Sequence, residues 1–175
     1  MWPFRRSPPV SPPLPPAASP PAGPPGRRAL SFLAPEQVAG LGQLPDAAIL
    51  GFLEEEAGGT ERFVPNPAFT ALLHDTLRRV LPGEPDWQQG AARQGEGWLY
   101  VIDLRTPDGP QGKVPFHDII GGFEVRDGRM LPDGYWANET YLAFTADGSI
   151  RLPPGLMAAL AQALLDPGTA APDRE

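Results

Sequence analysis

The sequence predicts an α+β fold: a four- or five-stranded, mainly antiparallel meander with an N-terminal helix pair and a C-terminal helix packed on it. Short apolar runs recur between turn signals from Trp98 to Leu152, and four Asp-Gly pairs divide this stretch. Asp-Gly between apolar runs is typical of hairpin turns, because a tight turn needs positive φ. Helical patterns precede this stretch at 35–81 and follow it at 154–165. The order of helices, strands and helix argues against an alternating parallel fold.

The chain of 175 residues has room for one domain with tails. We assign residues 31–167 to a single α+β domain, residues 1–30 to a disordered proline-rich tail and residues 168–175 to a frayed C-terminal tail. Proline lacks an amide donor and fixes φ, so the first segment cannot form a core. It is expected to be extended and solvated.

The charge and composition of the chain exclude several kinds of partner and catalytic site. The net charge is −7, and residues 1–28 carry four arginines and no acid, so the rest of the chain carries a net charge of −11. Such an acidic body repels phosphate backbones, which argues against nucleic acid and favours a basic protein partner. There is no cysteine, which excludes disulfides, thiolate metal sites and cysteine nucleophiles.

The sequence also bears on location. Its apolar runs are far shorter than the ~20 residues of a membrane-spanning helix, so we expect no membrane partner. Arg5-Arg6 is followed by prolines and serines and not by the apolar stretch of a signal peptide, which predicts a cytoplasmic protein. One lysine stands against thirteen arginines, beside 25 prolines and 20 glycines. This composition is typical of a GC-rich bacterial genome.

Three helices are expected before the strands. The first, at 35–41, begins with a proline and ends near a glycine; the second, at 46–57, has Asp46 as its cap and Gly58-Gly59 as its end. The third, at 67–81, has Asn66 as its cap, a proline at the first helical position and apolar residues at helical spacing.

The second of these helices would end in three carboxylates, Glu54, Glu55 and Glu56. Carboxylates at a helix C-terminus oppose the helix dipole. Such a conflict can mark a site that binds a cation or a basic partner. The alternative is a solvated acidic end.

Strands follow at 98–104, 118–125, 129–131, 140–145 and 149–152. The connection 84–97 is interpreted as an edge strand over 86–93 or a long loop. Both faces of 98–104 are mainly apolar, which predicts a central strand. Gly121-Gly122 predicts a bulge or a close backbone approach. The final helix, at 154–165, carries a single apolar stripe.

A polar and aromatic segment is the leading candidate for a binding site. Residues 132–139 are expected to connect two strands, and functional residues favour loops held on a rigid frame. The candidate binding residues are Tyr135, Trp136, Asn138 and Glu139, together with the three glutamates at 54–56. Alternatively, Tyr135 or Trp136 folds back onto the core while Asn138 shapes the turn.

His117, Asp118 and Asp103 form the alternative, catalytic candidate. A base and its orienting carboxylate could be assembled from them, but no nucleophile elbow accompanies them. His74 lacks a second ligand at helical spacing and is expected on the surface. No Walker loop, dinucleotide fingerprint, zinc-protease motif or EF-hand spacing occurs, so we expect no cofactor and no metal.

The favoured hypothesis is a non-enzymatic acidic protein-binding module, of the kind found in inhibitors and antitoxin-like proteins. The alternative is a small hydrolase or transferase that uses His117 and neighbouring carboxylates. The sequence predicts no particular oligomeric state.

Overall fold

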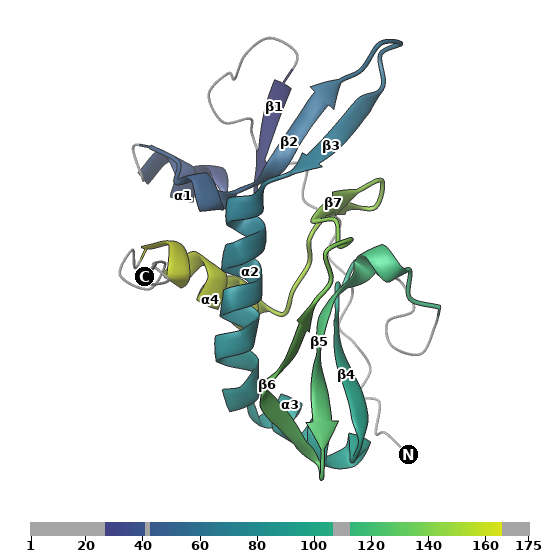
Figure 1. The fold of residues 1–175 in the computed structure, drawn as a ribbon. Helices are drawn as coiled ribbons and strands as arrows, with labels where there is room; N and C mark the ends of the chain where they lie inside the picture. The colour runs from purple at the N-terminus through teal and green to yellow at the C-terminus, as the bar shows by residue number, and fades with distance from the viewer. Residues whose placement is uncertain (1–26, 41–42, 107–112, 166–175) are drawn as a thin grey trace, which may run out of the picture.

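The computed structural model describes residues 27–40, 43–106 and 113–165. Within them it has antiparallel sheets and four α-helices, so the α+β fold class is confirmed. The strands form three separate sheets and not one sheet of four or five strands. Figure 1 shows two three-stranded sheets, one above the other, with the long helix α2 running from the first to a position beside the second. Residues 168–175 and most of the predicted N-terminal tail lie outside the described residues.

The first sheet has the strand order β1-β2-β3, with β1 at Arg27–Ser31, β2 at Ile49–Glu55 and β3 at Glu61–Pro65. Residues 27–30, which were predicted to belong to the disordered tail, are part of β1. Between β1 and β2 lie the predicted first helix, confirmed as α1 at Pro35–Gly40, and a 3-10 turn, η1, at Asp46–Ala48.

The predicted helix at 46–57 is wrong. Its apolar residues form β2, which pairs with β1 and β3 and buries Leu50 and Leu53. A short apolar run fits a helix and a buried strand equally well, and here strand pairing decides between them. Gly58 and Gly59, expected to end a helix, have φ of 111° and 78° and instead form the turn between β2 and β3.

The second sheet has the order β4-β5-β6, with β4 at Gly97–Ile102, β5 at Ile119–Arg126 and β6 at Arg129–Ala137. A 3-10 turn, η4, at Phe116–Asp118 leads into β5. Asp127 and Gly128 have φ of 49° and 69° and form the predicted hairpin turn. The central strand is β5, so the prediction that 98–104 is central is wrong. Most of the expected loop at 132–139 belongs to β6.

The remaining strands and helices complete the fold. Two short strands, β7 at Phe144–Thr145 and β8 at Gly148–Ser149, pair around the predicted turn at Asp147-Gly148. The predicted helices at 67–81 and 154–165 are confirmed as α2, Pro67–Val80, and α4, Pro154–Leu165. A 3-10 turn, η2, at Leu81–Gly83 connects α2 to α3, which spans Pro85–Gln94 where an edge strand or loop was expected.

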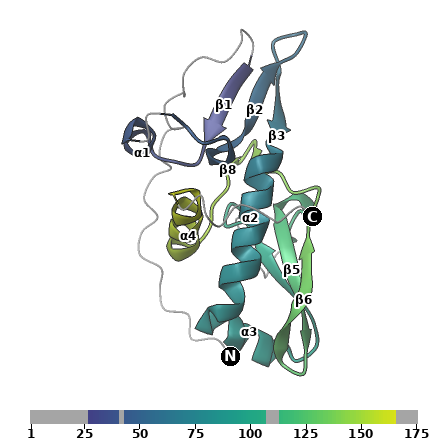
Figure 2. The same cartoon turned by 60° about the vertical axis from the view of Figure 1, so that its left-hand side comes forward.

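The core forms where α2 lies between the second sheet and α4. Leu73 and Leu77 of α2 are fully buried together with Phe123 of β5 and Leu160 of α4. Figure 2 shows α4 beside α2, on the side away from β5 and β6. In Figure 1, α3 passes behind the lower end of the second sheet, where Trp87 contacts Phe123 edge-on. Among the described residues, no helix covers the opposite face of this sheet.

The two three-stranded sheets are built on the same unit, which we call the first unit, residues 27–66, and the second unit, residues 97–138. In both, a proline precedes a 3-10 turn that leads into the central strand: Pro45 before η1 and Pro115 before η4. In both, the register between the first two strands shifts at the same place. Gly51 and Gly121 then sit at matching positions, and a Cβ on either would lie within 2.6 Å of a carbonyl oxygen of the third strand.

An asparagine closes both units in the same way. The Nδ2 group of Asn66 donates to the carbonyls of Asp46 and Ile49 at 2.8 and 2.9 Å. The Nδ2 group of Asn138 donates to the carbonyls of Phe116 and Ile119, both at 2.8 Å. The Oδ1 atom of each accepts from the amide two residues later. This repeated pattern shows that the chain contains two copies of one structural unit.

Candidate functional site

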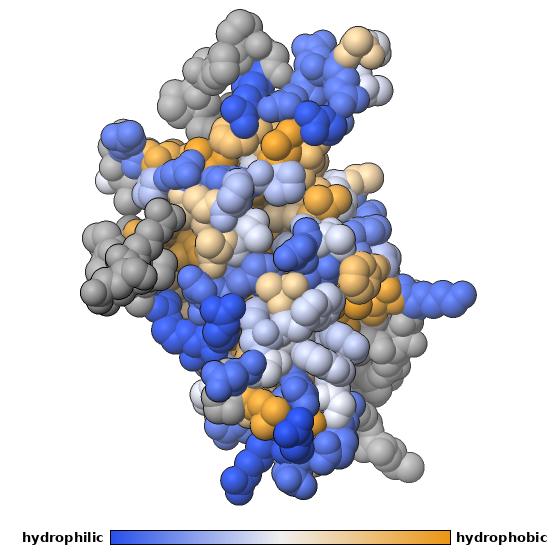
Figure 3. All heavy atoms as spheres, in the orientation of Figure 1, coloured by the Kyte–Doolittle hydropathy of each residue, from blue (hydrophilic) through white to orange (hydrophobic). Residues whose placement is uncertain are grey.

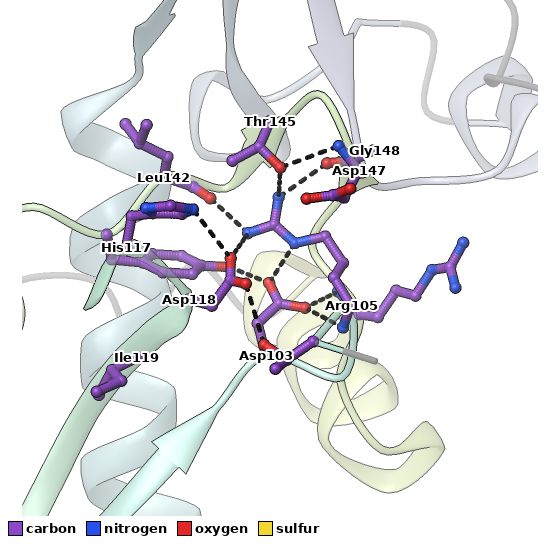
Figure 4. Close-up of polar contacts among 12 residues, drawn as sticks. Asp103, Arg105, His117, Asp118, Ile119, Leu142, Thr145, Asp147 and Gly148 are labelled. Atoms are coloured by element: carbon purple, nitrogen blue, oxygen red, sulfur yellow. Dashed lines mark hydrogen bonds and ion pairs between the residues drawn. The ribbon is translucent and has the colours of Figure 1, made fainter. Parts of the chain in front are cut away.

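The structure brings Asp103 and Asp118 together, as the catalytic hypothesis required, but around an arginine that it did not include. Figure 4 shows Arg105 between the two carboxylates. Its Nε lies 2.9 Å from Asp103 Oδ2, although this N–H is not aligned for a hydrogen bond. Its Nη2 lies 3.4 Å from Asp118 Oδ1. The side chains of Arg105 and Asp103 are 1% and 0% exposed, so this is a buried ion-pair cluster.

Both carboxylates also accept hydrogen bonds from other groups. Asp103 Oδ1 accepts from the amides of Arg105 and Arg151, and its Oδ2 accepts from the Tyr141 hydroxyl at 2.7 Å. Asp118 Oδ2 accepts from the Thr106 hydroxyl at 3.0 Å. A buried charge is tolerated when it is paired and hydrogen-bonded in this way.

The guanidinium of Arg105 also connects the end of β4 to the β7–β8 hairpin. It donates to the carbonyls of Leu142 and Gly148 and to the Thr145 hydroxyl (Figure 4). Burial is the first cause that raises the pKa of Tyr141, and the charge of Asp103 is the second. Tyr141 is therefore a neutral donor to Asp103. The cluster fixes segments that are far apart in the sequence.

His117 is half-exposed at the edge of this cluster. Its Nε2 lies 3.9 Å from Asp118 Oδ1 (Figure 4), too far for a hydrogen bond. Asp118 already accepts from Thr106 and faces Arg105, so no carboxylate here is open to a substrate. This geometry gives no support to a hydrolase or transferase centred on His117, Asp118 and Asp103.

Tyr135 and Trp136 point to opposite faces of β6. The Tyr135 hydroxyl lies 2.7 Å from Nδ1 of His74 on α2, and its ring packs on Phe123 at 4.9 Å between centroids. His74 is buried, so the prediction that it lies on the surface is wrong. Burial, followed by the charge of Arg78, lowers the pKa of His74, while burial raises the pKa of Tyr135. Both side chains are neutral, and Tyr135 is a core residue.

The other predicted binding residues do not form one surface: some have structural roles, and the glutamates at 54–56 lie on the first sheet, away from Asn138 and Glu139. Asn138 is buried, and its side chain closes the second unit, which is the arrangement expected if it shapes the turn. Glu139 is exposed in the turn that follows. Glu54 and Glu56 were predicted at the end of a helix, but they lie at the β2–β3 hairpin, where Arg62 pairs with both at 3.0 Å. Glu55 is exposed on the same hairpin.

Aromatic side chains gather on the uncovered face of the second sheet, which we call the open face. Tyr100 of β4 and Trp136 of β6 both lie opposite Gly122 of β5 in the strand register. A Cβ at Gly122 would meet the Tyr100 ring at 3.1 Å, so the glycine leaves room for aromatic rings over the central strand. Phe116 packs on Trp136 at 6.0 Å between ring centroids. Trp98, Tyr100 and Phe116 are 41%, 46% and 57% exposed.

Of the predicted site residues, only Trp136 belongs to this surface. Trp98 and Tyr100 were expected in a covered central strand, because a run apolar on both sides is typical of one. The pairing of Gly122 with aromatic neighbours was the available signal, since aromatic residues are often placed opposite glycines in sheets. In Figure 3 the middle of the second sheet is mostly pale, which means that its residues are neither strongly hydrophilic nor strongly hydrophobic.

A groove of about 980 Å³ runs along the outer edge of β4. Its floor is apolar, with Leu81, Trp87, Val101, Leu152 and Leu156 among its lining residues. The exposed acids Glu84 and Asp86 lie at its rim. Among its described lining residues none is Lys, Arg or His. The groove is thus apolar with an acidic border.

Within the described ranges, no three His, Asp or Glu side chains lie close enough to hold a metal ion. None of the helices that the structure describes has the length and apolar character to cross a bilayer.

No family model, curated protein or solved structure matches this chain. A function for this chain must therefore be inferred from its fold and from the geometry of its surface.

Proposed function

We propose that this chain is a non-enzymatic, acidic protein-binding module that contacts its partner through the open face of the second sheet. The exposed cluster of Trp98, Tyr100 and Phe116 supports this proposal most directly. Tryptophan and tyrosine supply large contact areas in protein interfaces and dominate their binding energy. Large aromatic residues that a domain leaves partly exposed on one surface often mark a site of protein interaction.

The charge of the chain supports a basic partner. The net charge is −7, and acidic side chains such as Glu84 and Asp86 border the second sheet. Complementary charge speeds association and selects the partner, while the aromatic rings provide affinity. Inhibitors and antitoxin-like proteins are one class that works in this way. The partner would be a protein with a cationic, partly apolar surface.

Affinity capture with the full chain tests this proposal. The partner is identified by mass spectrometry, purified, and titrated against the native chain and a Tyr100→Ser, Phe116→Ser variant. We expect the variant to bind at least tenfold more weakly and to keep its thermal midpoint within a few degrees, because both rings are exposed. An Arg79→Ser variant, changed on the exposed side of α2, is the matched control.

Binding is also expected to weaken as salt is raised from about 50 to 500 mM, because rim charges are screened. Equal affinity of the native chain and the double variant would overturn the proposal. So would the failure to capture any protein that binds again in purified form.

A further inference from the structure

We propose that the outer edge of β4 is a docking site for an extended basic peptide segment of the partner, which adds to the second sheet as a fourth strand. This inference rests on the proposed function and names the chemistry of its partner. It concerns the backbone edge of β4 and the groove beside it, whereas the proposed function rests on the aromatic rings of the open face.

Within the part of the chain that the structure describes, no strand pairs with the outer side of β4. Among the described strands, β4 pairs only with β5. In an antiparallel pair, alternate residues direct their N–H and C=O groups away from the neighbouring strand. The Asp103 amide donates to Asp118 on the β5 side, and the next amide, of Leu104, donates to Arg151 on the other side. Trp98, Tyr100 and Ile102 share the outward direction of Leu104. No described residue bonds to their backbone groups on that side.

β4 differs from the other edge strands of the two large sheets. β1 carries Arg27 and Arg28, β3 carries Glu61 and Arg62, and β6 carries Arg129. β4 reads Gly-Trp-Leu-Tyr-Val-Ile, with neither a charged residue nor a proline. Charges and prolines on edge strands prevent unwanted strand pairing, so an edge without them is a template for another strand. Among the described strands of these two sheets, β4 alone lacks this protection.

The groove fits the side chains of an added strand. An extended segment beside β4 would direct alternate side chains to opposite faces. One set would lie beside Trp98 and Tyr100 on the open face. The other set would enter the apolar groove near Val101, Leu81 and Leu156. Backbone hydrogen bonds to an edge and pockets for alternate side chains are the two components of recognition by strand addition.

Charge selects the class of peptide. The groove is bordered by Glu84 and Asp86 and, in its described lining, has no cationic side chain. A segment that alternates apolar and basic residues would complement both the floor and the rim. A second copy of this chain would bring the same acidic rims together, and like charges oppose such pairing. The occupant that we propose is therefore a basic strand of another protein.

Synthetic peptides test the inference directly. The probe is a nine-residue peptide of alternating valine and lysine, blocked at both ends, titrated into the full chain and followed by the amide NMR signals of β4. A matched peptide with glutamate in place of lysine tests the charge. Two further forms carry N-methyl groups on the even or the odd amides. Strand addition uses every second amide, so one methylated form should lose binding and the other should keep it.

A pair of variants tests the edge itself. Tyr100→Pro and Tyr100→Val both remove the ring, but only proline removes the outward amide, and proline is tolerated at edge positions that face solvent. We expect the proline variant to bind the lysine peptide at least tenfold more weakly than the valine variant, provided that their thermal midpoints agree within a few degrees. Should the proline variant not fold, the N-methylated peptides decide the question with the native chain.

Three results would overturn the inference: equal or absent binding of the lysine and glutamate peptides, equal binding of the two methylated forms, or self-association of the chain through β4 in sedimentation experiments. The purified partner separates this inference from the proposed function. If the Tyr100→Ser, Phe116→Ser variant loses the partner while Tyr100→Pro and Tyr100→Val bind it equally, the open face binds and the edge does not.

Discussion

The first and second units share a frame, and they differ most at the position just before the central strand. That position is Ala48 in the first unit and Asp118 in the second, and both are buried. The first unit is closed by Asn66 and continues directly into α2, whereas the second is closed by Asn138 and continues into a turn and the β7–β8 hairpin. Asp118 and Arg105 attach that hairpin to the end of β4. The polar cluster is therefore an addition specific to the second unit.

The outer faces of the two sheets also differ. In the first unit a large residue, Phe52, lies between the smaller Ala29 and Val64. In the second unit the order is reversed, with Gly122 between Tyr100 and Trp136. The proline, glycine and asparagine shared by both units hold the fold. The positions at which they differ carry the buried ion pairs and the aromatic surface.

The largest expected loss of stability comes from the buried ion-pair cluster of the second unit, and it should exceed the loss from the exposed ion pairs of the first unit. Arg105→Met leaves Asp103 and Asp118 buried without their cation, and we expect a loss of about 3–5 kcal/mol of unfolding free energy. Arg62→Met removes exposed ion pairs with Glu54 and Glu56 and should cost less than about 1 kcal/mol. Urea denaturation of both variants measures the difference. Similar losses would mean that the cluster does not stabilise the second unit.

The closing asparagines test whether the two units are equivalent. Asn66→Ala and Asn138→Ala each leave two carbonyls without their Nδ2 donor, and we expect each to cost about 2 kcal/mol. Asn→Asp at either position keeps the acceptor oxygen but loses the donor, so it should be nearly as costly. Denaturant midpoints of the four variants provide the measurement. A large loss at one position and none at the other would argue against a shared frame.

Glycine substitutions test the same equivalence of the two units, with an expected cost similar to that of the asparagine variants. A Cβ at Gly51 or Gly121 would lie 2.4 Å from the Val64 carbonyl oxygen or 2.5 Å from that of Trp136. We expect Gly51→Ala and Gly121→Ala each to cost about 1–3 kcal/mol. At Gly122 the nearest atom belongs to the Tyr100 ring, which can move, so Gly122→Ala should cost less. Thermal unfolding would contradict this account if Gly122→Ala were the most damaging of the three.

The smallest expected effect depends on pH and on His74, which contacts the second unit through Tyr135. Burial lowers the pKa of His74 in the folded chain below its usual value of 6.5, so the unfolded chain binds the proton more tightly. His74 therefore favours folding less as the pH falls from about 7 toward the lowered pKa. The native chain should lose more stability between pH 7.5 and 5 than His74→Gln, measured by urea denaturation. Parallel losses would show that His74 does not titrate in this range.

Local signals in the sequence were sufficient for several elements. The cap at Asn66 and the stop at Pro82-Gly83 define α2, and Asp127-Gly128 defines the hairpin between β5 and β6. The run at 49–53 fits a helix as well as a strand, and only pairing with β1 and β3 decides between them. Whether a strand lies at the edge or the centre of a sheet depends on partners that its own residues do not reveal.

The candidate site was predictable only in part. The proximity of His117, Asp118 and Asp103 was foreseen, but the sequence gives no sign that Arg105 would occupy the space between the carboxylates. The repeat had a signal that was overlooked: Pro45, Ile49 and Gly51 recur at the same spacing as Pro115, Ile119 and Gly121. Recognition of this repeat would have predicted a strand beginning at Ile49 in place of the helix at 46–57.

Native-state amide hydrogen exchange on the full chain without any peptide tests the central claim most directly. If the second unit presents a free edge, the amides of Leu99 and Val101, which face β5, should be protected, while those of Trp98, Tyr100 and Ile102 should exchange rapidly. Strong protection of all five amides would show that another segment already covers the edge of β4, and would contradict the account of β4 as a docking strand.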